Sequence, residues 1–277
     1  MREYADVAII ILNYVSWEAT LKEAAWIREL FSLEWEQIII IDNASPNESS
    51  VKLKENAIGN YQFIENDKNV GYAKGNNIGL KLAKKQGYRY AWILNNDVMV
   101  EDKELLRRLL QVFSIDKKVA IVNPDIYSLE GKIFNRDSKR FSFWDMTLGM
   151  VCYRKKGREI EDLGGYGYVY RPQGCCMLMD LEKLAEVNYL DENTFLYCEE
   201  MIVSERLLRK NYLCACATDI HIVHDHSRTV KLSLKKQKII REQVRSFRYY
   251  LNTYRYYHFA KEVICLFFFA LKSFFTV

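Results

Sequence analysis

The chain has 277 residues, of which 49% are hydrophobic and only 3 are proline, so it can bury a sizeable core and is too apolar for a disordered protein. Its formal net charge is +4, and its 7 cysteines include no Cys-x-x-Cys pair. This cysteine pattern argues against a disulfide framework and favours reduced thiols in a cytosolic compartment. The N-terminus lacks a signal-peptide layout, because the first apolar run ends at Asn13.

Strand and helix patterns alternate through the first half of the chain. The apolar run Val7–Leu12 predicts a buried strand, and apolar residues at helical spacing predict a helix from Trp17 to Phe31. The capping-box pattern Ser45-Pro46-Asn47-Glu48 predicts that a helix begins there with Ser45 as its N-cap. The other expected elements are strands at Gln37–Ile41, Tyr61–Glu65, Trp92–Leu94 and Val119–Val122, and helices ending at Lys85 and covering Leu105–Phe113. This alternation predicts an α/β fold, Rossmann-like, with a mostly parallel central sheet flanked by helices.

The second half of the chain is harder to interpret. Asp125–Pro172 is a mixed segment rich in Arg, Lys, Gly and aromatic residues, and we expect a functional insert with short strands of its own. Cys175–Met179 returns to a strand pattern, a helix is expected from Glu199 to about Asn211, and Cys214–Val223 alternates loosely as a strand.

Polar residues follow four of the expected strands. Asn13, Asp42, Asn69 and Asp97 each come just after a strand's carboxyl end, where open α/β sheets bind ligands. Asp42 can accept a hydrogen bond from the N–H of a pyrimidine ring, and its alternative role is to cap the next helix. Four polar strand ends that converge on one sheet edge predict a binding site there.

Asn95-Asn96-Asp97 ends an apolar run abruptly, and two interpretations of it are open. A carboxylate beside two amides can hold a hard divalent cation and, through it, a diphosphate. The same three residues are also good turn chemistry. Asp97 is the only carboxylate of the three, so a metal site would depend mainly on this residue.

The segment Asn69–Asn77 is a glycine-containing loop that leads into a helix. Such a helix N-terminus suits phosphate, through free backbone N–H groups and the helix dipole. Lys74 places a positive charge in the first turn, where the dipole disfavours one; an anionic partner would explain it, as would an ordinary solvated lysine. No phosphate-binding motif of the form GxxxxGK[ST] occurs.

Two further groups of residues suit catalysis or metal binding. Either Glu199 or Glu200 can act as a general base toward a hydroxyl, although acids in a first helical turn are also stabilised by the helix dipole. His224 and His226 lie two apart at the end of the last expected strand, so both would face one side and could join Asp97 at a metal. Surface or core histidines without a metal are the alternative.

The C-terminal residues 231–277 form a segment distinct from the main domain, residues 1–230. Lys231–Lys261 contains nine Lys or Arg residues and several tyrosines, and Val263–Val277 is rich in Phe. A basic, aromatic segment that leads into a short apolar helix suits an interface with anionic lipids. A helix that packs on the domain is the alternative, and no recognised motif supports nucleic-acid binding.

Taken together in order and spacing, these motifs resemble those of the inverting family 2 glycosyltransferases with the GT-A fold, particularly the bacterial rhamnosyltransferase-like branch that builds surface polysaccharides. The resemblance runs from about Val7 to Ser227. The matching segments are Ile10–Tyr14, Ile41–Ser45, Asn69–Gly79, Leu94–Asp97, Gly174 with its following strand, and Leu190–Glu200.

The resemblance implies roles for these residues. Asp97 would meet Mg²⁺ or Mn²⁺ on the donor diphosphate, Glu200 falls at the position of the catalytic base, and His224 or His226 would approach the metal or the phosphates. The nucleotide sugar would be bound by Asn13, Tyr14, Asp42, Asn43, Asn69, Gly71, Lys74, Asn77, Asn95 and Asn96.

This chain departs from the family pattern at four positions. Asn95 replaces the first carboxylate of the DxD motif, and Glu replaces the usual catalytic Asp, so Glu199 and Glu200 both stay open as the base. Ile202 stands where a further Asp is common. Val15 replaces an Asn often found after the Tyr.

The resemblance implies a metal-dependent hexosyl- or rhamnosyltransferase. A UDP- or dTDP-sugar would be the donor, and a glycan or polyprenyl-diphosphate-linked glycan the acceptor. The enzyme would work in the cytoplasm at the inner face of the plasma membrane, with peripheral membrane contact through the tail and no nucleic-acid partner. Two other classes remain: a catalytically weak nucleotide-sugar-binding scaffold of a polysaccharide assembly complex, and a nucleotidyltransferase.

Overall fold

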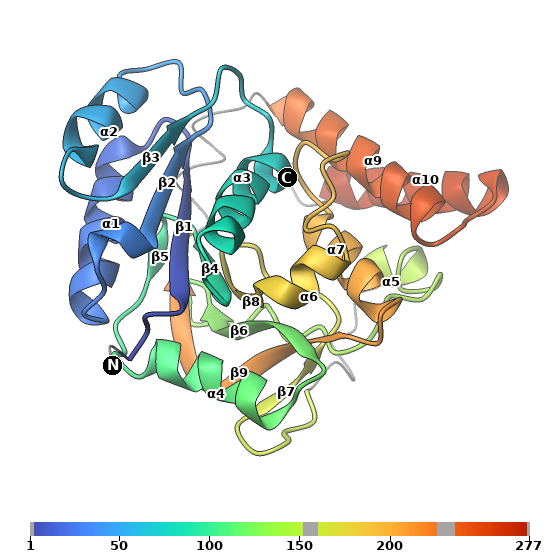
Figure 1. Cartoon of the computed structure of the whole chain (residues 1–277). Helices are drawn as coiled ribbons and strands as arrows, with labels where there is room; N and C mark the ends of the chain where they lie inside the picture. Colours follow the sequence, from blue (N-terminus) through green and yellow to red (C-terminus); the bar gives the residue numbers. More distant parts are fainter. Residues whose placement is uncertain (1–2, 152–159, 226–235, 276–277) are drawn as a thin grey trace.

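The computed structural model describes residues 3–151, 160–225 and 236–275, which form a mixed sheet with helices on both faces (Figure 1). The strands are β1 (Val7–Asn13), β2 (Ile38–Asp42), β3 (Gln62–Glu65), β4 (Tyr90–Leu94), β5 (Val98–Met99), β6 (Val119–Tyr127), β7 (Tyr166–Val169), β8 (Cys176–Asp180) and β9 (Leu213–His224). The helices are α1 (Trp17–Leu30), α2 (Ser49–Ala57), α3 (Tyr72–Lys85), α4 (Leu105–Ile115), α5 (Leu148–Val151), α6 (Leu181–Glu186), α7 (Glu199–Leu208), α9 (Lys236–Thr253) and α10 (Phe259–Phe275), with a 3₁₀ turn at Trp35–Gln37.

The sheet runs in the order β3-β2-β1-β4-β8-β6-β9-β5, and β7 pairs with β9 beside this path. The predicted parallel pairing holds for β3-β2-β1-β4, whose strands are joined by helices. β8 then runs antiparallel between β4 and β6, and β5 and β7 are antiparallel to β9. The sheet is therefore more mixed than expected, because β8 follows the long insert and not a crossover helix that would impose a parallel direction.

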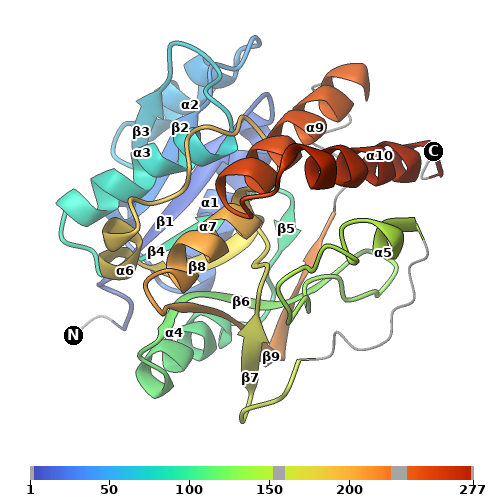
Figure 2. The same ribbon diagram turned by 90° about the vertical axis from the view of Figure 1, so that its right-hand side faces the viewer.

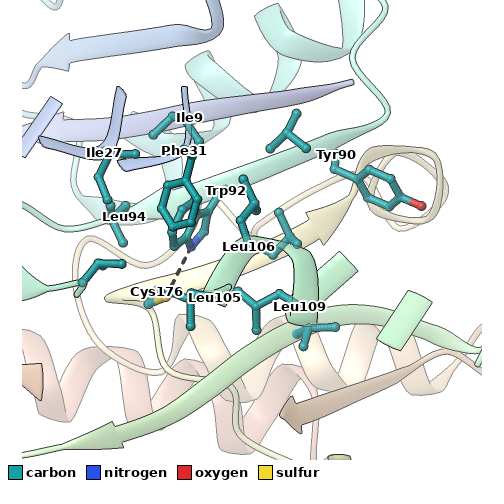
Figure 3. Packing of buried hydrophobic residues seen from close by; sticks show 14 of the residues in the cluster. Ile9, Ile27, Phe31, Tyr90, Trp92, Leu94, Leu105, Leu106, Leu109 and Cys176 are labelled. Atoms are coloured by element: carbon teal, nitrogen blue, oxygen red, sulfur yellow. Dashed lines mark hydrogen bonds between the residues drawn. The ribbon is translucent and has the colours of Figure 1, made fainter. Parts of the chain in front are cut away.

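The core lies on both faces of this sheet. In β2, Ile38 and Ile40 point into one hydrophobic cluster, which α1, α2 and α4 cover. Ile39 and Ile41 point into the other, beneath α3, α6 and α7. Trp92 lies at the centre of the first cluster against Phe31, and its indole N–H donates to the Cys176 sulfur at 3.3 Å (Figure 3). Burial on both faces explains why these strands are apolar at every position.

The start of α2 differs from the sequence prediction. The helix begins at Ser49 with Glu48 at the N-cap, so Ser45 is not the cap. The Ser45 side chain instead donates to Asp42 Oδ1 at 2.6 Å and accepts the backbone N–H of Val15 at 2.8 Å. The local capping pattern is overridden because the same hydroxyl is used to join the loops that follow β1 and β2.

Helix α5 of the insert lies near the C-terminal helices (Figure 2), and the insert shares a third hydrophobic cluster with them. Met146 of the insert and Ile202 of α7 pack against Phe247 and Tyr250 of α9 and Cys265 of α10. Helix α10 lies beside α9 and also contacts α5. In the described ranges, none of the helices has both the length and the apolar character that a bilayer-spanning helix requires.

Candidate active site

Asp97 and His224 meet because β5 pairs with the end of β9. Val98 lies opposite His224 in this antiparallel pair, and Asp97 directly precedes Val98. The His224 Nε2 atom lies 3.0 Å from Asp97 Oδ1, and both side chains are largely buried. Two of the predicted metal ligands thus lie side by side, whereas the third, His226, falls outside the described residues.

The chemistry of this pair fits a divalent cation. Carboxylate oxygens suit Mg²⁺ and Mn²⁺, and an imidazole nitrogen is a further ligand that Mn²⁺ accepts. No cluster of three His, Cys, Asp or Glu side chains suited to a metal occurs among the described residues. A cation held by Asp97 and His224 would therefore have coordination positions left for oxygens of a bound ligand.

A buried chain of hydrogen bonds connects Asp42 to the Asn95-Asn96-Asp97 motif. Asn13 donates to Asp42 Oδ1 at 2.6 Å and accepts from the Thr20 hydroxyl at 2.7 Å. Asn96 Nδ2 then donates to Thr20 Oγ1 at 2.7 Å. Asn13 and Asp42 are both 0% exposed, so in this conformation they hold the strand ends together and present no surface to a ligand. The sequence analysis missed Thr20, which looks like an ordinary helix residue.

Three backbone N–H groups at the start of the Asn69–Asn77 segment already donate to acceptors within the protein. Asn43 Oδ1 accepts the N–H of Val70, Asn69 Oδ1 accepts that of Gly71, and the Phe195 carbonyl accepts that of Tyr72 at 2.9 Å. These three N–H groups are therefore not available to a phosphate in this conformation, and phosphate binding by the rest of the helix N-terminus stays a prediction. Asn43 and Asn69 instead join the end of β2 to the start of α3.

Two other residues of this segment also make contacts within the protein, to the Leu190–Cys198 loop. Asn77 is buried and bonds both the N–H and the carbonyl of Leu190, which ties α3 to the Leu190–Cys198 loop. Gly71 has φ +85°, and a Cβ there would overlap the Phe195 carbonyl, so only glycine permits this close approach. Asn77 and Gly71 thus position the loop that carries the acidic pair.

Tyr14, Lys74 and Asn95 remain at or near the surface around this edge. Tyr14 is partly exposed after β1, and Lys74 is exposed in the first turn of α3. Asn95 is partly exposed, and its backbone N–H donates to the Cys175 carbonyl at 2.9 Å. These three residues can therefore reach a ligand at the site without rearrangement of the core.

The structure separates the roles of Glu199 and Glu200. Glu199 is 4% exposed, and its Oε1 accepts no hydrogen bond from the described residues. Burial, with a smaller contribution from the charge of Glu200, raises the pKa of Glu199 to about 8. Glu200 is partly exposed and accepts the Gly174 N–H at 3.3 Å. Only Glu200 combines access to a ligand with an ordinary carboxylate hydrogen bond.

Glu200 and Asp97 lie on two sides of Gly174–Cys175, the two residues that lead into β8. Glu200 bonds Gly174, and the next residue, Cys175, accepts the N–H of Asn95. The pKa of the buried Cys175 thiol is raised by burial first and then by several negative charges, among them those of Asp97 and Glu200. Tyr72 also contacts this segment, since its hydroxyl donates to the Gly174 carbonyl at 2.5 Å. The metal-binding and base candidates therefore share one site.

A second buried acid, Glu23, lies close enough to feel the charge of Asp97, although none of the sequence motifs includes it. Burial raises the pKa of Glu23 to about 8, and the Asp97 charge adds to the effect. A signal was present in the sequence. Glu23 is three residues after Thr20 and four before Ile27, so it lies on the buried stripe of α1. A charged residue on an otherwise apolar helix face indicates a candidate site residue.

Helix α9 fixes the loop that precedes Glu199. The Tyr249 hydroxyl donates to Asp191 Oδ2 at 2.9 Å, and Tyr254 donates to the same oxygen. The Ser246 hydroxyl donates to the Leu196 carbonyl at 2.8 Å. The last two residues of the loop, Tyr197 and Cys198, have left-handed φ values of 77° and 68°. A strained turn of this kind persists only where neighbouring contacts hold it.

Known proteins share this architecture. GalNAc-T7 with UDP, GalNAc and Mn²⁺ aligns over 88% of this chain and 47% of its own, with a TM-score of 0.62 and 14% identity. For the mannosyltransferase PcManGT from Pyrobaculum calidifontis, in complex with GDP-Man and Mn²⁺, the coverages are 94% and 68%, the TM-score is 0.60 and the identity is 11%. For S. aureus TarS 1-349 they are 90% and 72%, with a TM-score of 0.54 and 12% identity. The chain thus spans less than half of the GalNAc-T7 chain, and these likenesses show the fold.

Sequence relatives lead to the same class. The low-salt glycan biosynthesis hexosyltransferase Agl10 of Haloferax volcanii is 24% identical over 226 residues, which are 79% of this chain and 67% of that protein. The fold class is that of the GT-A glycosyltransferases, as the sequence predicted. The family model for glycosyl transferase family 2 matches residues 6–185, and the chain belongs to that family.

Proposed function

We propose that this protein transfers a sugar from a nucleotide-diphosphate sugar to a hydroxyl group of a glycan acceptor, with inversion at the anomeric carbon. The observation that carries the proposal is the placement of the Asp97–His224 pair and Glu200 around the Gly174–Cys175 segment. A cation-binding pair and a carboxylate base on two sides of one small region suit a displacement that needs both.

Asp97 and His224 are the residues that would hold Mg²⁺ or Mn²⁺. When bound, the cation supplies positive charge that stabilises the nucleoside diphosphate as it leaves. Asn95, Asn96, Tyr14 and Lys74 would contact the donor, since they are partly or fully exposed where β4 and β1 end and α3 begins. Asp42 and Asn13 would bind the nucleotide base of the donor. Because both side chains are fully buried, they would first have to give up hydrogen bonds to each other or to Ser45.

The proposed reaction is a single displacement. Glu200 accepts the proton of an acceptor hydroxyl, and the oxygen forms a bond to the anomeric carbon of the donor sugar while the bond to the diphosphate oxygen breaks. The products are the glycoside and a nucleoside diphosphate, with the proton on Glu200. Attack from the face opposite the leaving group inverts the anomeric centre. Glu199 has no such role here, because it is buried and its pKa is raised by that burial.

The donor and acceptor classes rest on family membership and the implied chemistry. A UDP- or dTDP-hexose or -rhamnose is the proposed donor, and a polyprenyl-diphosphate-linked glycan of bacterial surface-polysaccharide synthesis is the proposed acceptor. The Haloferax relative is a hexosyltransferase of glycan biosynthesis, which supports the reaction type. A lipid-linked acceptor would place the enzyme in the cytoplasm at the inner face of the plasma membrane.

Donor binding can be tested by thermal shift with a panel of nucleotide sugars, each with and without Mn²⁺. A true donor at ~100 times its Kd stabilises the native state by about 2.7 kcal/mol. We expect this stabilisation to require Mn²⁺ and to be lost in Asp97→Asn, which keeps the side-chain size and removes the charge. The matched control is Asp102→Asn, which makes the same change at an exposed carboxylate past the motif and should leave the stabilisation intact.

The identified donor is then given to the enzyme with a glycan acceptor, and the anomeric configuration of the product is determined. A product of inverted configuration is the expected result. Donor binding without transfer to any acceptor would contradict the proposal and favour a nucleotide-sugar-binding scaffold. Consumption of a nucleoside triphosphate with release of pyrophosphate would instead indicate a nucleotidyltransferase.

A further inference from the structure

Helix α10 presents an apolar stripe to solvent. Phe259, Val263 and Phe267 recur every four residues and are 76%, 46% and 59% exposed, with Ile264 alongside. The spacing i, i+4, i+8 places these side chains on one face of the helix. A soluble monomer rarely leaves so continuous an apolar helix face uncovered, so the stripe indicates a contact surface.

The opposite face of α10 is firmly packed. Phe269 stacks on Phe247 of α9 with ring centroids 5.1 Å apart, Glu262 pairs with Arg248 at 2.5 Å, and Cys265 is fully buried. The orientation of α10 is therefore fixed by α9. Because the inner face already has its partners, the outer stripe is not the result of a helix that has failed to dock.

The insert carries further exposed apolar side chains beside α10. Helix α5 contacts α10 at the same end of the molecule (Figure 2). Trp144, just before α5, is 66% exposed and Leu148 is 48% exposed. Large aromatic side chains with an apolar body and a polar N–H are typical of the lipid–water boundary.

Exposed basic side chains lie on α10 and on α9, the helix beside it. Arg241, Arg245 and Arg248 follow one another at positions i, i+4 and i+7 on α9, and all three are exposed. Lys261 is exposed on α10 itself, with its ammonium group 5.7 Å from the Tyr257 ring. The combination of an apolar stripe and neighbouring positive charges complements a surface with an apolar interior and anionic head groups.

We propose that the outer face of α10, with Trp144 and Leu148, inserts shallowly into an anionic lipid bilayer while Arg241, Arg245 and Lys261 contact its head groups. The 17 residues of α10 are fewer than the ~20 that span a bilayer, so the helix lies in the interface. The inference deepens the proposed function and rests on it, because it gives the surface on which a lipid-linked acceptor would be met. Helix α9 contacts both the inner face of α10 and the loop before Glu199, so the bilayer would lie near the acceptor side of the site.

Vesicle flotation with the full chain tests the proposal, without donor or acceptor, so that its outcome is independent of transfer activity. We expect binding to phosphatidylcholine vesicles that contain phosphatidylglycerol, and at least ~10-fold weaker binding to pure phosphatidylcholine, given about 1 kcal/mol for each basic residue. High salt should weaken the binding. The double variant Val263→Glu/Phe267→Glu should reduce it by about 10-fold or more, because each exposed apolar side chain contributes on the order of a kcal/mol when buried.

Two controls separate lipid contact from misfolding and from self-association. Ile58→Glu changes an isolated apolar residue that is 86% exposed beyond α2, and it should leave vesicle binding unchanged. All variants should keep the wild-type melting temperature, since the substituted side chains are exposed. Equal binding to neutral and anionic vesicles, or unchanged binding by the double variant, would overturn the proposal. So would a wild-type dimer that the double variant converts to a monomer, because the stripe would then serve a second copy.

Discussion

At the residue scale, the site rests on side chains in unusual environments. Val15 lies in the loop after β1 with φ +61°, a left-handed conformation that a β-branched residue strongly disfavours. Its N–H donates to Ser45 and its carbonyl accepts from Asn47 at 3.0 Å, and these bonds hold the loop in place. The family pattern often has Asn at this position, and Asn tolerates the left-handed region.

Val15→Asn should therefore stabilise the fold. Relief of the backbone strain is worth about 1 kcal/mol, which raises the melting temperature of a protein of this size by roughly 2–4 °C. Val15→Ala is the matched control, because it shortens the side chain but keeps a Cβ in the strained conformation. A thermal melt in which the Asn variant is no more stable than the Ala variant would show that the left-handed conformation is not costly here.

The buried acid Glu199 predicts a specific pH dependence of stability. Its ordinary pKa of 4.5 is raised to about 8 in the folded protein, so between these values the native state holds a proton that the unfolded state has released. The contribution is fully present below pH ~4.5 and is lost as the pH rises toward ~8. The free energy of unfolding should fall across this window by up to about 1.4 kcal/mol per pH unit.

Glu199→Gln should make this slope shallower by the share of Glu199, since glutamine does not titrate, while Glu23, whose pKa is also raised to about 8, keeps its own share. Denaturant unfolding at several pH values between 5 and 8 measures it, with Glu29→Gln, an exposed residue on α1, as the control. Parallel pH profiles for wild type and Glu199→Gln would contradict the assignment of a protonated Glu199.

At the element scale, α9 acts as a brace for the loop that leads into α7. Burial alone would raise the pKa of Asp191, but hydrogen bonds from Tyr254, Asn193 and Tyr249 hold it below its usual range. Since each tyrosine hydroxyl satisfies a buried carboxylate, removal of both donors leaves a charge with fewer partners. The loop residues between Asp191 and Glu199 would then lose one of their anchors.

The double variant Tyr249→Phe/Tyr254→Phe should be less stable by about 1–3 kcal/mol and slower in transfer, because the base is held less well. Tyr256→Phe, at a tyrosine that is 69% exposed, is the control. The expected kinetic signature is a larger effect on kcat than on donor KM, since the loop leads directly into the helix that carries Glu200. A double variant with wild-type stability and kcat would show that α9 does not brace the loop.

At the scale of the whole molecule, the sequence predicted the first four strands and the helices between them. Strands β1, β2 and β4 are buried on both faces and each forms one apolar run, whereas β3 at the sheet edge is only partly buried. The sequence also predicted that Asp97 and His224 could meet, although they are 127 residues apart. The contact itself depends on the β5–β9 register, and two-residue β5 has too short a pattern to reveal that register.

Other features depend on long-range contacts that a local pattern does not contain. Ser45 leaves its predicted cap position because the β1 loop offers it other partners. In the Asn69–Asn77 segment, the N–H of Val70 donates to Asn43 of the β2 loop, and that of Tyr72 donates to Phe195, which is far along the chain. Asp42 is likewise covered by Asn13 and Ser45. Sequence motifs thus indicated which residues gather at the site. The structure shows which of their polar groups already bond to other residues of the protein.

The most direct test of the account compares Glu200→Gln with Glu199→Gln in transfer. With saturating donor, acceptor and Mn²⁺, Glu200→Gln should lower kcat by ~10²–10⁴, the usual contribution of a general base, while donor binding by thermal shift is retained. Glu199→Gln should stay within ~10-fold of wild type, because an already protonated side chain takes no proton. Wild-type turnover by Glu200→Gln, or loss of turnover only in Glu199→Gln, would contradict the assignment of Glu200 as the base.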